Sequence, residues 1–166
     1  MNASEEQERE SSEWNVRELS AGEFDALSAA SEYGGFQQTS EMAALAQSEG
    51  MQTQYVGLVD SHDVPVAGAL VAFSQGRFGV EGSLWLGPLC NGNDGEQMTA
   101  LTDGLREVAE RVHAISLTCW PNQVYCVRDS QGKVMAEPND EMVREYERLG
   151  WKHAGFARGY GALMNR

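Results

Sequence analysis

The sequence predicts a mixed α/β domain in which helices flank a mostly antiparallel sheet. Several short segments rich in β-branched and aromatic residues are separated by turn residues, as strands are. Between them lie segments with apolar residues at steps of three and four, which indicates amphipathic helices. A chain of 166 residues suffices for one domain with a hydrophobic core and is short for two.

The first half predicts a strand, two helices and three further strands. Residues 14–19 alternate as a strand does, and Ser20 and Glu23 then have the spacing of a capping box. A second helix is expected over residues 39–49, ended by Gly50 in a left-handed conformation. The residues of this helix expected to pack inward are Met42, Leu45 and Ala46. The strands of the following antiparallel meander are expected at residues 52–60, 64–73 and 77–87.

A long helix follows, and Asn93 or Asp94 can cap its start. One face of this helix is apolar, with Met98, Leu101, Leu105, Val108 and Val112. Residues 114–120 form an apolar run that ends at Pro121, so we expect a buried strand there.

The C-terminal part predicts a hairpin, a helix and a closing strand. Residues 124–127 and 133–135 flank a turn sequence, Asn139 caps the last helix, and Gly150 ends it. The inward side chains of that helix are expected to be Met142, Val143, Tyr146 and Leu149. Residues 151–156 are expected to form the closing strand. This order of elements is that of an N-acyltransferase domain of the GNAT type.

Charge and composition restrict the function. The formal net charge of −13 disfavours nucleic-acid binding by this chain alone. No apolar run reaches the roughly 20 residues of a membrane span. We expect residues 1–13 to be a disordered acidic tail and residues 14–166 to form a single domain. The three widely spaced cysteines suit a reducing compartment. We therefore expect the protein to be cytoplasmic, with the inner face of the membrane as a candidate location.

Cofactor and metal motifs give no site. A coenzyme A loop of the form (Q/R)-x-x-G-x-(G/A) holds pyrophosphate at a helix N-terminus. Residues 47–52 and 158–163 both fail at its last position, so we expect no coenzyme A and no other cofactor. The histidines His62, His113 and His153 have no partner at metal-ligand spacing, so no metal site is expected. No catalytic residue is assigned.

A cleft is expected where the third meander strand ends at Gly87-Pro88, since proline cannot continue the strand pairing. Trp85, just before this point, could stack on a sugar or base edge there, or it could be an ordinary core tryptophan.

Five segments in order resemble the Fem family of peptidoglycan branching enzymes, the FemABX or MurM-like aminoacyltransferases. The segments are LSAGEFDAL (19–27), GGFQQTSEM (34–42), GMQTQYVGLVDSHDVPVAGALV (50–71), LGPLCN (86–91) and LGWKHAGFARGYG (149–161). They are similar to the family's opening helix, its F-x-Q-(T/S) segment, its first hairpin, its G-P-(V/L)-x-D motif and its L-G-(F/Y)-x-x-x-G-(F/Y) stretch.

The resemblance implies an enzyme that moves an amino acid from aminoacyl-tRNA to the stem-peptide amine of a lipid-linked or nucleotide-linked peptidoglycan precursor. Family members have two GNAT-like domains, and this chain resembles the first. The tRNA would therefore require a second domain, and the chain alone is expected to be inactive. The residues expected to line the acceptor side are Gln38, Trp85, Gly87, Pro88 and Asn91.

The chain departs from the family at the positions that carry charge. Ala44 and Ala46 stand where the family has lysines that face the diphosphate, and Leu86 stands where it often has Arg or Lys. Asn91 replaces the motif's Asp and cannot act as a base. These departures leave two alternatives open: a non-catalytic binding module, and a free-standing small-molecule N-acetyltransferase, against which the missing coenzyme A loop counts.

Overall fold

The computed structural model describes residues 14–90 and 95–155. The chain forms two compact units, whose boundary in the sequence lies between Gln123 and Val124. The predicted tail at residues 1–13, the helix cap at Asn93 or Asp94, and the site residue Asn91 lie outside the described residues.

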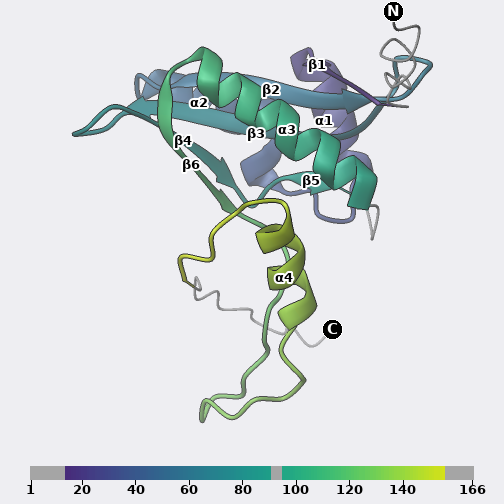
Figure 1. Ribbon diagram of the computed structural model, residues 1–166, viewed down its shortest axis with the longest axis vertical. Helices are drawn as coiled ribbons and strands as arrows, with labels where there is room; N and C mark the ends of the chain where they lie inside the picture. The colour runs from purple at the N-terminus through teal and green to yellow at the C-terminus, as the bar shows by residue number, and fades with distance from the viewer. Residues whose placement is uncertain (1–13, 91–94, 156–166) are drawn as a thin grey trace, which may run out of the picture. The chain divides into compact units, whose positions relative to one another are not determined.

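A mixed sheet forms the centre of the first unit (Figure 1). Its strands lie in the order β1-β2-β3-β4-β6, and the short β5 also pairs with β3. All described pairs are antiparallel except β4 with β6, which is parallel. The predicted meander and mostly antiparallel sheet are thus confirmed. The strands are β1 Asn15–Glu18, β2 Gln52–Val59, β3 Pro65–Gln75, β4 Val80–Trp85, β5 Leu89–Cys90 and β6 Ala114–Trp120.

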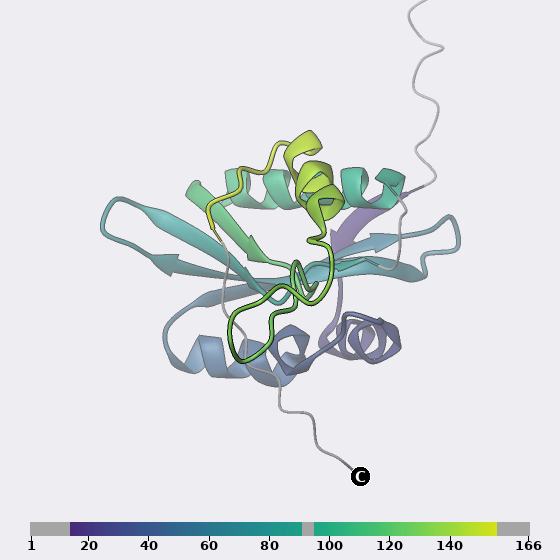
Figure 2. The same cartoon turned by 90° about the horizontal axis from the view of Figure 1, so that it is seen from below.

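Helices cover both faces of this sheet, with α1 and α2 on one side and α3 on the other (Figure 2). A side chain at Gly104 of α3 would place its Cβ 2.5 Å from Val16 Cγ1, so the glycine allows α3 to approach β1 closely. The helices of this unit are α1 Ala21–Ala30, the 3₁₀ helix η1 Phe36–Gln38, α2 Ser40–Ser48 and α3 Gly95–Arg111.

The predicted helix ends are confirmed on the α1 and α2 side. Ser20 and Glu23 form the capping box at the start of α1, since each side chain accepts a hydrogen bond from the other's backbone N–H. Thr39 caps α2 by accepting from the backbone N–H of Met42. Gly50 follows α2 with φ of 86°, the left-handed conformation that favours glycine.

The inward face of α2 is only partly as predicted. Ala46 is buried and Met42 packs against the core, but Leu45 is 48% exposed, so its predicted inward position is wrong. The contacting face is set by Ala43 and Ala46, and Leu45 is turned about 100° from Ala46 around the helix axis.

Two apolar layers hold the unit together. On the α1 and α2 side, the ring of Phe24 stacks on Tyr55 with 4.9 Å between centroids. The buried cluster on this side consists of Leu19, Phe24, Leu27, Ala43, Val59, Leu70 and Leu89. On the other side α3 buries Leu101, Leu105 and Val108, three of its five predicted inward residues, while Met98 and Val112 are half-buried.

Residues 114–120 form the predicted strand, β6, but the prediction that it is buried is wrong. Ile115 is 57% exposed and Trp120 is 55% exposed. The reason is the position of β6 at the end of the described strand order, with β4 on one side only. An apolar run cannot by itself distinguish a central strand from an edge strand.

The second unit contains α4, Asp140–Arg148, which Asn139 caps as predicted. The four residues expected on its inward face are half-buried and the rest of the helix is exposed, so the face is correct. The depth is wrong, because no described residue of this unit is buried. The predicted hairpin is present in short form: Arg128 and Val134 form an antiparallel bridge, flanked by the hydrogen bonds from Asp129 N–H to the Lys133 carbonyl and from Met135 N–H to the Val127 carbonyl. Residues 151–155 form no strand, so the prediction of a closing strand is wrong there. A strand needs a partner, which periodicity does not supply.

Candidate functional site

The sheet splits where β4 leaves β3. Ala72 of β3 lies opposite Ser83, and Gly68 lies opposite Leu89. Between these two pairs β3 advances by four residues, from 72 to 68, whereas the segment that joins β4 to β5 advances by six, from 83 to 89. This segment therefore contains two extra residues. The strand predicted over 77–87 is shorter in the structure, β4 Val80–Trp85, and Leu86–Pro88 form a bulge between it and β5, which lies beyond the predicted range.

The side chain of Gln38 fills this split and is 1% exposed. Its Oε1 accepts from the backbone N–H of Leu70 at 2.9 Å, and its Nε2 donates to the carbonyl of Leu70 at 3.4 Å. The same Nε2 donates to the carbonyl of Trp85 at 2.9 Å. Both ends of the amide are thus occupied by backbone groups. Direct contact of Gln38 with a ligand stays a prediction, and it would require the ligand to displace one of these partners.

The bulge packs directly against this amide. A Cβ at Gly87 would lie 2.8 Å from the Gln38 side chain, so only glycine fits there without movement. Leu86, just before it, has φ of 51°, a conformation that L-residues adopt rarely. The structure therefore brings together Gln38, Trp85, Gly87 and Pro88, four of the five predicted site residues.

Two tryptophans lie side by side at the carboxyl ends of β4 and β6. Trp85 and Trp120 are register partners in the parallel pair, and register partners project to the same face of a sheet. Trp85 is half-buried and Trp120 is 55% exposed, so together they present aromatic surface to solvent. Trp120 was not predicted as a site residue, because residues 114–120 were expected to form a buried strand.

The segment after β6 is joined to the loop that precedes η1. The Nδ2 of Asn122 donates to the carbonyl of Tyr33 at 3.0 Å. The ring of Phe36, which begins η1, is 59% exposed. This hydrogen bond joins the loop before η1 to the segment that follows Trp120. The sequence offered no signal for Asn122, since the contact spans 89 positions.

The described cations of this unit lie elsewhere. Arg17, on β1 at the other edge of the sheet, is paired with Glu23 at 2.7 Å and Asp63 at 2.8 Å. Arg77 lies in the turn before β4, at the opposite end from Trp85, and its guanidinium lies over the Phe78 ring. Two further arginines belong to α3, on the other face. Within this unit, the residues around the bulge therefore offer no described cation for a diphosphate.

The described residues include one thiol whose reactivity is suppressed by burial. Burial raises the pKa of the Cys119 thiol to about 12, so it remains protonated at neutral pH and is a poor nucleophile. Within residues 14–90 and 95–155, no cluster of His, Cys, Asp and Glu could hold a metal ion. In the same part of the chain, no helix is both long and apolar enough to cross a membrane.

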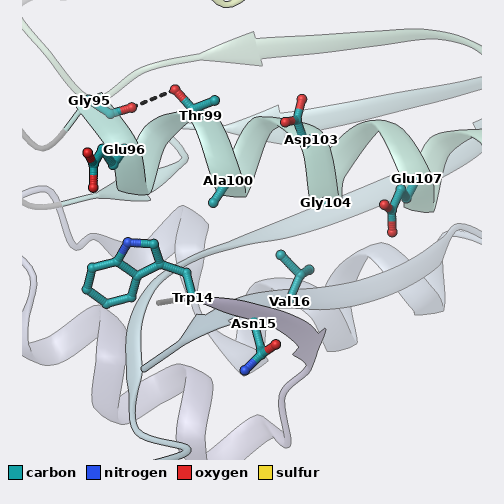
Figure 3. Close-up of a pocket in the computed structure, with 10 residues that line it drawn as sticks. All are labelled: Trp14, Asn15, Val16, Gly95, Glu96, Thr99, Ala100, Asp103, Gly104 and Glu107. Carbon is teal, nitrogen blue, oxygen red and sulfur yellow. Dashed lines mark hydrogen bonds between the residues drawn. The ribbon is translucent and has the colours of Figure 1, made fainter. Parts of the chain in front are cut away.

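A separate pocket of about 840 Å³ lies between β1 and α3 (Figure 3). The indole of Trp14 and the side chain of Val16 face α3 here, and the carboxylates of Glu96, Asp103 and Glu107 lie along that helix. The lining includes none of the predicted site residues. It is an acidic surface at the opposite edge of the sheet from β4 and β6.

The meander, the helix α3 and the parallel strand β6 define an acyltransferase fold of the GNAT type. A protein named as a probable acetyltransferase superposes with a TM-score of 0.55 at 10% identity, covering 92% of this chain and 99% of its own. A Pyrococcus furiosus protein assigned as an acetyl transferase gives 0.54 at 10% identity, covering 90% of this chain and 100% of its own. The predicted GNAT-like fold is confirmed.

FemX is a further structural neighbour, with a TM-score of 0.70 at 18% identity over 89% of this chain and 34% of FemX. The sequence pattern of the FemAB family matches residues 19–166. The chain belongs to the FemAB family, as the sequence motifs predicted, and it spans about a third of the length of FemX. No match was found among curated proteins.

Proposed function

We propose that this chain is the N-terminal domain of a tRNA-dependent aminoacyltransferase that adds an amino acid to the stem peptide of a peptidoglycan precursor. In this proposal the unit that ends at Gln123 provides the acceptor-side wall of the cleft. Membership of the FemAB family supports the reaction class, and the chain's coverage of FemX supports the assignment to one domain of a longer enzyme.

The observation that carries the proposed site is the aromatic surface beside the bulge. Trp85 and Trp120 lie in register on one face, and Gly87 and Pro88 form the adjoining turn. Aromatic rings stack well on the apolar face of a sugar or on a planar group. Asn91, which lies outside the described residues, would be a further residue of this wall. Gln38 would hold the wall in place through its hydrogen bond to the Trp85 carbonyl.

The charge distribution decides which part of the acceptor this wall would contact. A diphosphate needs cations or several amide donors to replace its water. The described arginines of this unit lie at the other edge of the sheet, at the opposite end of β4 and on the other face. The wall would therefore contact the sugar and peptide parts of the precursor, and the diphosphate would find its cations outside the described residues of this unit.

The test is the binding of the soluble nucleotide-linked precursor, measured by titration calorimetry. Trp120→Ala is expected to weaken binding about fivefold, since one aromatic stacking contact contributes on the order of 1 kcal/mol. Phe78→Ala is the matched control, because Phe78 is 79% exposed and lies in the turn before β4, at the opposite end of that strand from Trp85. Equal affinities of the two variants would reject the aromatic wall.

Carrier binding is assigned to a second domain. A net charge of −13 repels tRNA, and the proposed transfer needs carrier and acceptor held together. We therefore expect no transfer of radiolabelled amino acid from charged tRNA by this chain alone. The enzyme would act in the cytoplasm, and on a lipid-linked precursor it would act at the inner face of the membrane. Transfer by the isolated chain would contradict the half-enzyme assignment.

One observation favours a second candidate, a non-catalytic binding module. The positions that carry cations and the motif carboxylate in the family are Ala44, Ala46, Leu86 and Asn91 here. A binding module would take up the precursor yet remain inactive when joined to a functional second domain. A small-molecule N-acetyltransferase ranks third, and micromolar binding of acetyl-CoA in calorimetry would promote it.

A further inference from the structure

Gln38 makes the hydrogen bonds of a strand residue although it lies in a 3₁₀ helix outside the sheet. The N–H and the carbonyl of Leu70 in β3 both bond to its side-chain amide. The carbonyl of Trp85, at the end of β4, bonds to the same amide. Backbone groups in the interior of a sheet normally bond to the neighbouring strand.

The split in the sheet explains this arrangement. β3 and β4 are paired from Gln75 with Val80 to Ala72 with Ser83, and beyond that point the two backbones separate. Without a replacement partner, the buried N–H of Leu70 would lose a hydrogen bond, at a cost comparable to an unmade backbone bond. An amide side chain supplies a donor and an acceptor in one plane, as a peptide group does.

We propose that Gln38 is a positioning residue whose side-chain amide replaces one peptide unit between β3 and β4. It holds the two strands apart at Leu70 and fixes the place of Trp85 and of the Gly87–Pro88 turn. Gly87 lies against the amide, so a longer residue at either position would displace the other. The inference stands on these contacts alone, and it gains functional weight if the turn is the acceptor wall proposed above.

The decisive property of the amide is that it donates and accepts at once. Gln38→Met keeps the length of the side chain and removes its donor and its acceptor. Gln38→Glu keeps the shape, but an ionised carboxylate only accepts, whereas a protonated carboxyl can donate to the Trp85 carbonyl and accept from Leu70. In the Glu variant the side chain can therefore replace the peptide group when its carboxyl is protonated, at low pH, and cannot do so when it is ionised.

The sign of the pH effect follows from burial. A buried carboxyl has a raised pKa, and the flanking elements carry further carboxylates, Asp25 on α1, Glu41 on α2 and Glu81 on β4, which act in the same direction. β3 itself carries no ionisable residue. The native state of the variant then binds a proton that the unfolded state releases above about pH 4.3. Its stability is highest below that pH and decreases as pH rises through the native pKa.

The experiment is urea unfolding of the whole chain at pH 5.5 and pH 8, for the wild type and three variants. Relative to wild type, Gln38→Glu is expected to lose on the order of tenfold or more in its folding equilibrium constant between pH 5.5 and 8, about tenfold per unit that its native pKa exceeds 5.5. Gln38→Met should lose stability equally at both values. Gln47→Glu is the matched control, since Gln47 is exposed, and it should show no such difference.

Amide hydrogen exchange at Leu70 provides the local measurement. Its protection should fall in Gln38→Met and should return in Gln38→Glu at pH 5.5. If a variant is unfolded at pH 8, recovery of the native spectrum by the Glu variant at pH 5.5 supports the proposal, and failure to recover contradicts it. The same pH-independent loss in both Gln38 variants, or unchanged Leu70 protection, would overturn it.

Discussion

His113 adopts a backbone conformation that glycine would adopt more easily. It follows α3 with φ of 55°, and its N–H bonds to the carbonyl of Glu110 at 3.0 Å. The side chain is exposed, so a substitution removes no packing. His113→Gly is expected to raise the free energy of unfolding by about 0.5–1 kcal/mol, because the left-handed strain is relieved. His113→Ala keeps the strain and is the control; an equal gain in both variants in urea unfolding would contradict this account.

Local chemistry in the sequence drew attention to several residues of the candidate site, whose role stays a prediction. Gly87 and Pro88 predicted the end of a strand, and the F-x-Q-(T/S) segment indicated Gln38. What the sequence could not show is the direction in which a side chain points. Gln38 faces the interior, and the sequence could not show this because its partners Leu70 and Trp85 lie 32 and 47 positions away. Trp120 was missed for the same reason, since its exposure depends on the edge position of β6.

At the scale of the element, the start of α1 links helix capping to pH. The carboxylate of Glu23 accepts from Arg17 Nη2 at 2.7 Å and from the backbone N–H of Ser20 at 2.8 Å. These hydrogen bonds lower the pKa of Glu23 from 4.5 to about 2, and the bond from Arg17 has a larger effect than those from Ser20. The carboxylate thus stabilises the folded state above pH 4.5, and this contribution is lost as pH falls towards 2.

Glu23→Gln removes the titrating group and keeps its shape. We expect the loss of stability between pH 5 and pH 2 to be smaller in this variant than in the wild type, measured by urea unfolding at low protein concentration. Glu41→Gln serves as control, because this carboxylate also lies in the first turn of a helix but belongs to α2. If both variants follow the wild-type pH curve, the capping network does not contribute to acid stability.

Elements with local signals were predicted more accurately than elements that need a distant partner. The capping box, the cap at Asn139 and the left-handed Gly50 are set within a few residues. By contrast, the strand expected at 151–156 has no strand structure over residues 151–155, and the strand expected at 77–87 is shortened to Val80–Trp85. Strand pairing depends on segments far along the chain, so hydrophobic periodicity alone could not supply it.

At the scale of the whole molecule, the two units differ in how much apolar surface they bury. The described residues 127–141 are all exposed, and none in 124–155 is buried. Trypsin is therefore expected to cut first after Arg128 or Lys133 and to spare Arg106 and Arg111 in α3. Mass spectrometry of a time course identifies the sites. Early cleavage within α3 would contradict the division of burial; the single cooperative domain expected over 14–166 stays a prediction.

The most direct test of the proposed acceptor wall is an NMR titration with the soluble nucleotide-linked precursor. Incorporating ¹⁵N-tryptophan labels four indoles, and substitution of each tryptophan by phenylalanine assigns them. We expect the indole signals of Trp85 and Trp120 to shift on binding, while that of Trp14, in the acidic pocket between β1 and α3, stays unchanged. A shift of Trp14 with Trp85 and Trp120 unmoved would contradict it and would move the site to the opposite edge of the sheet.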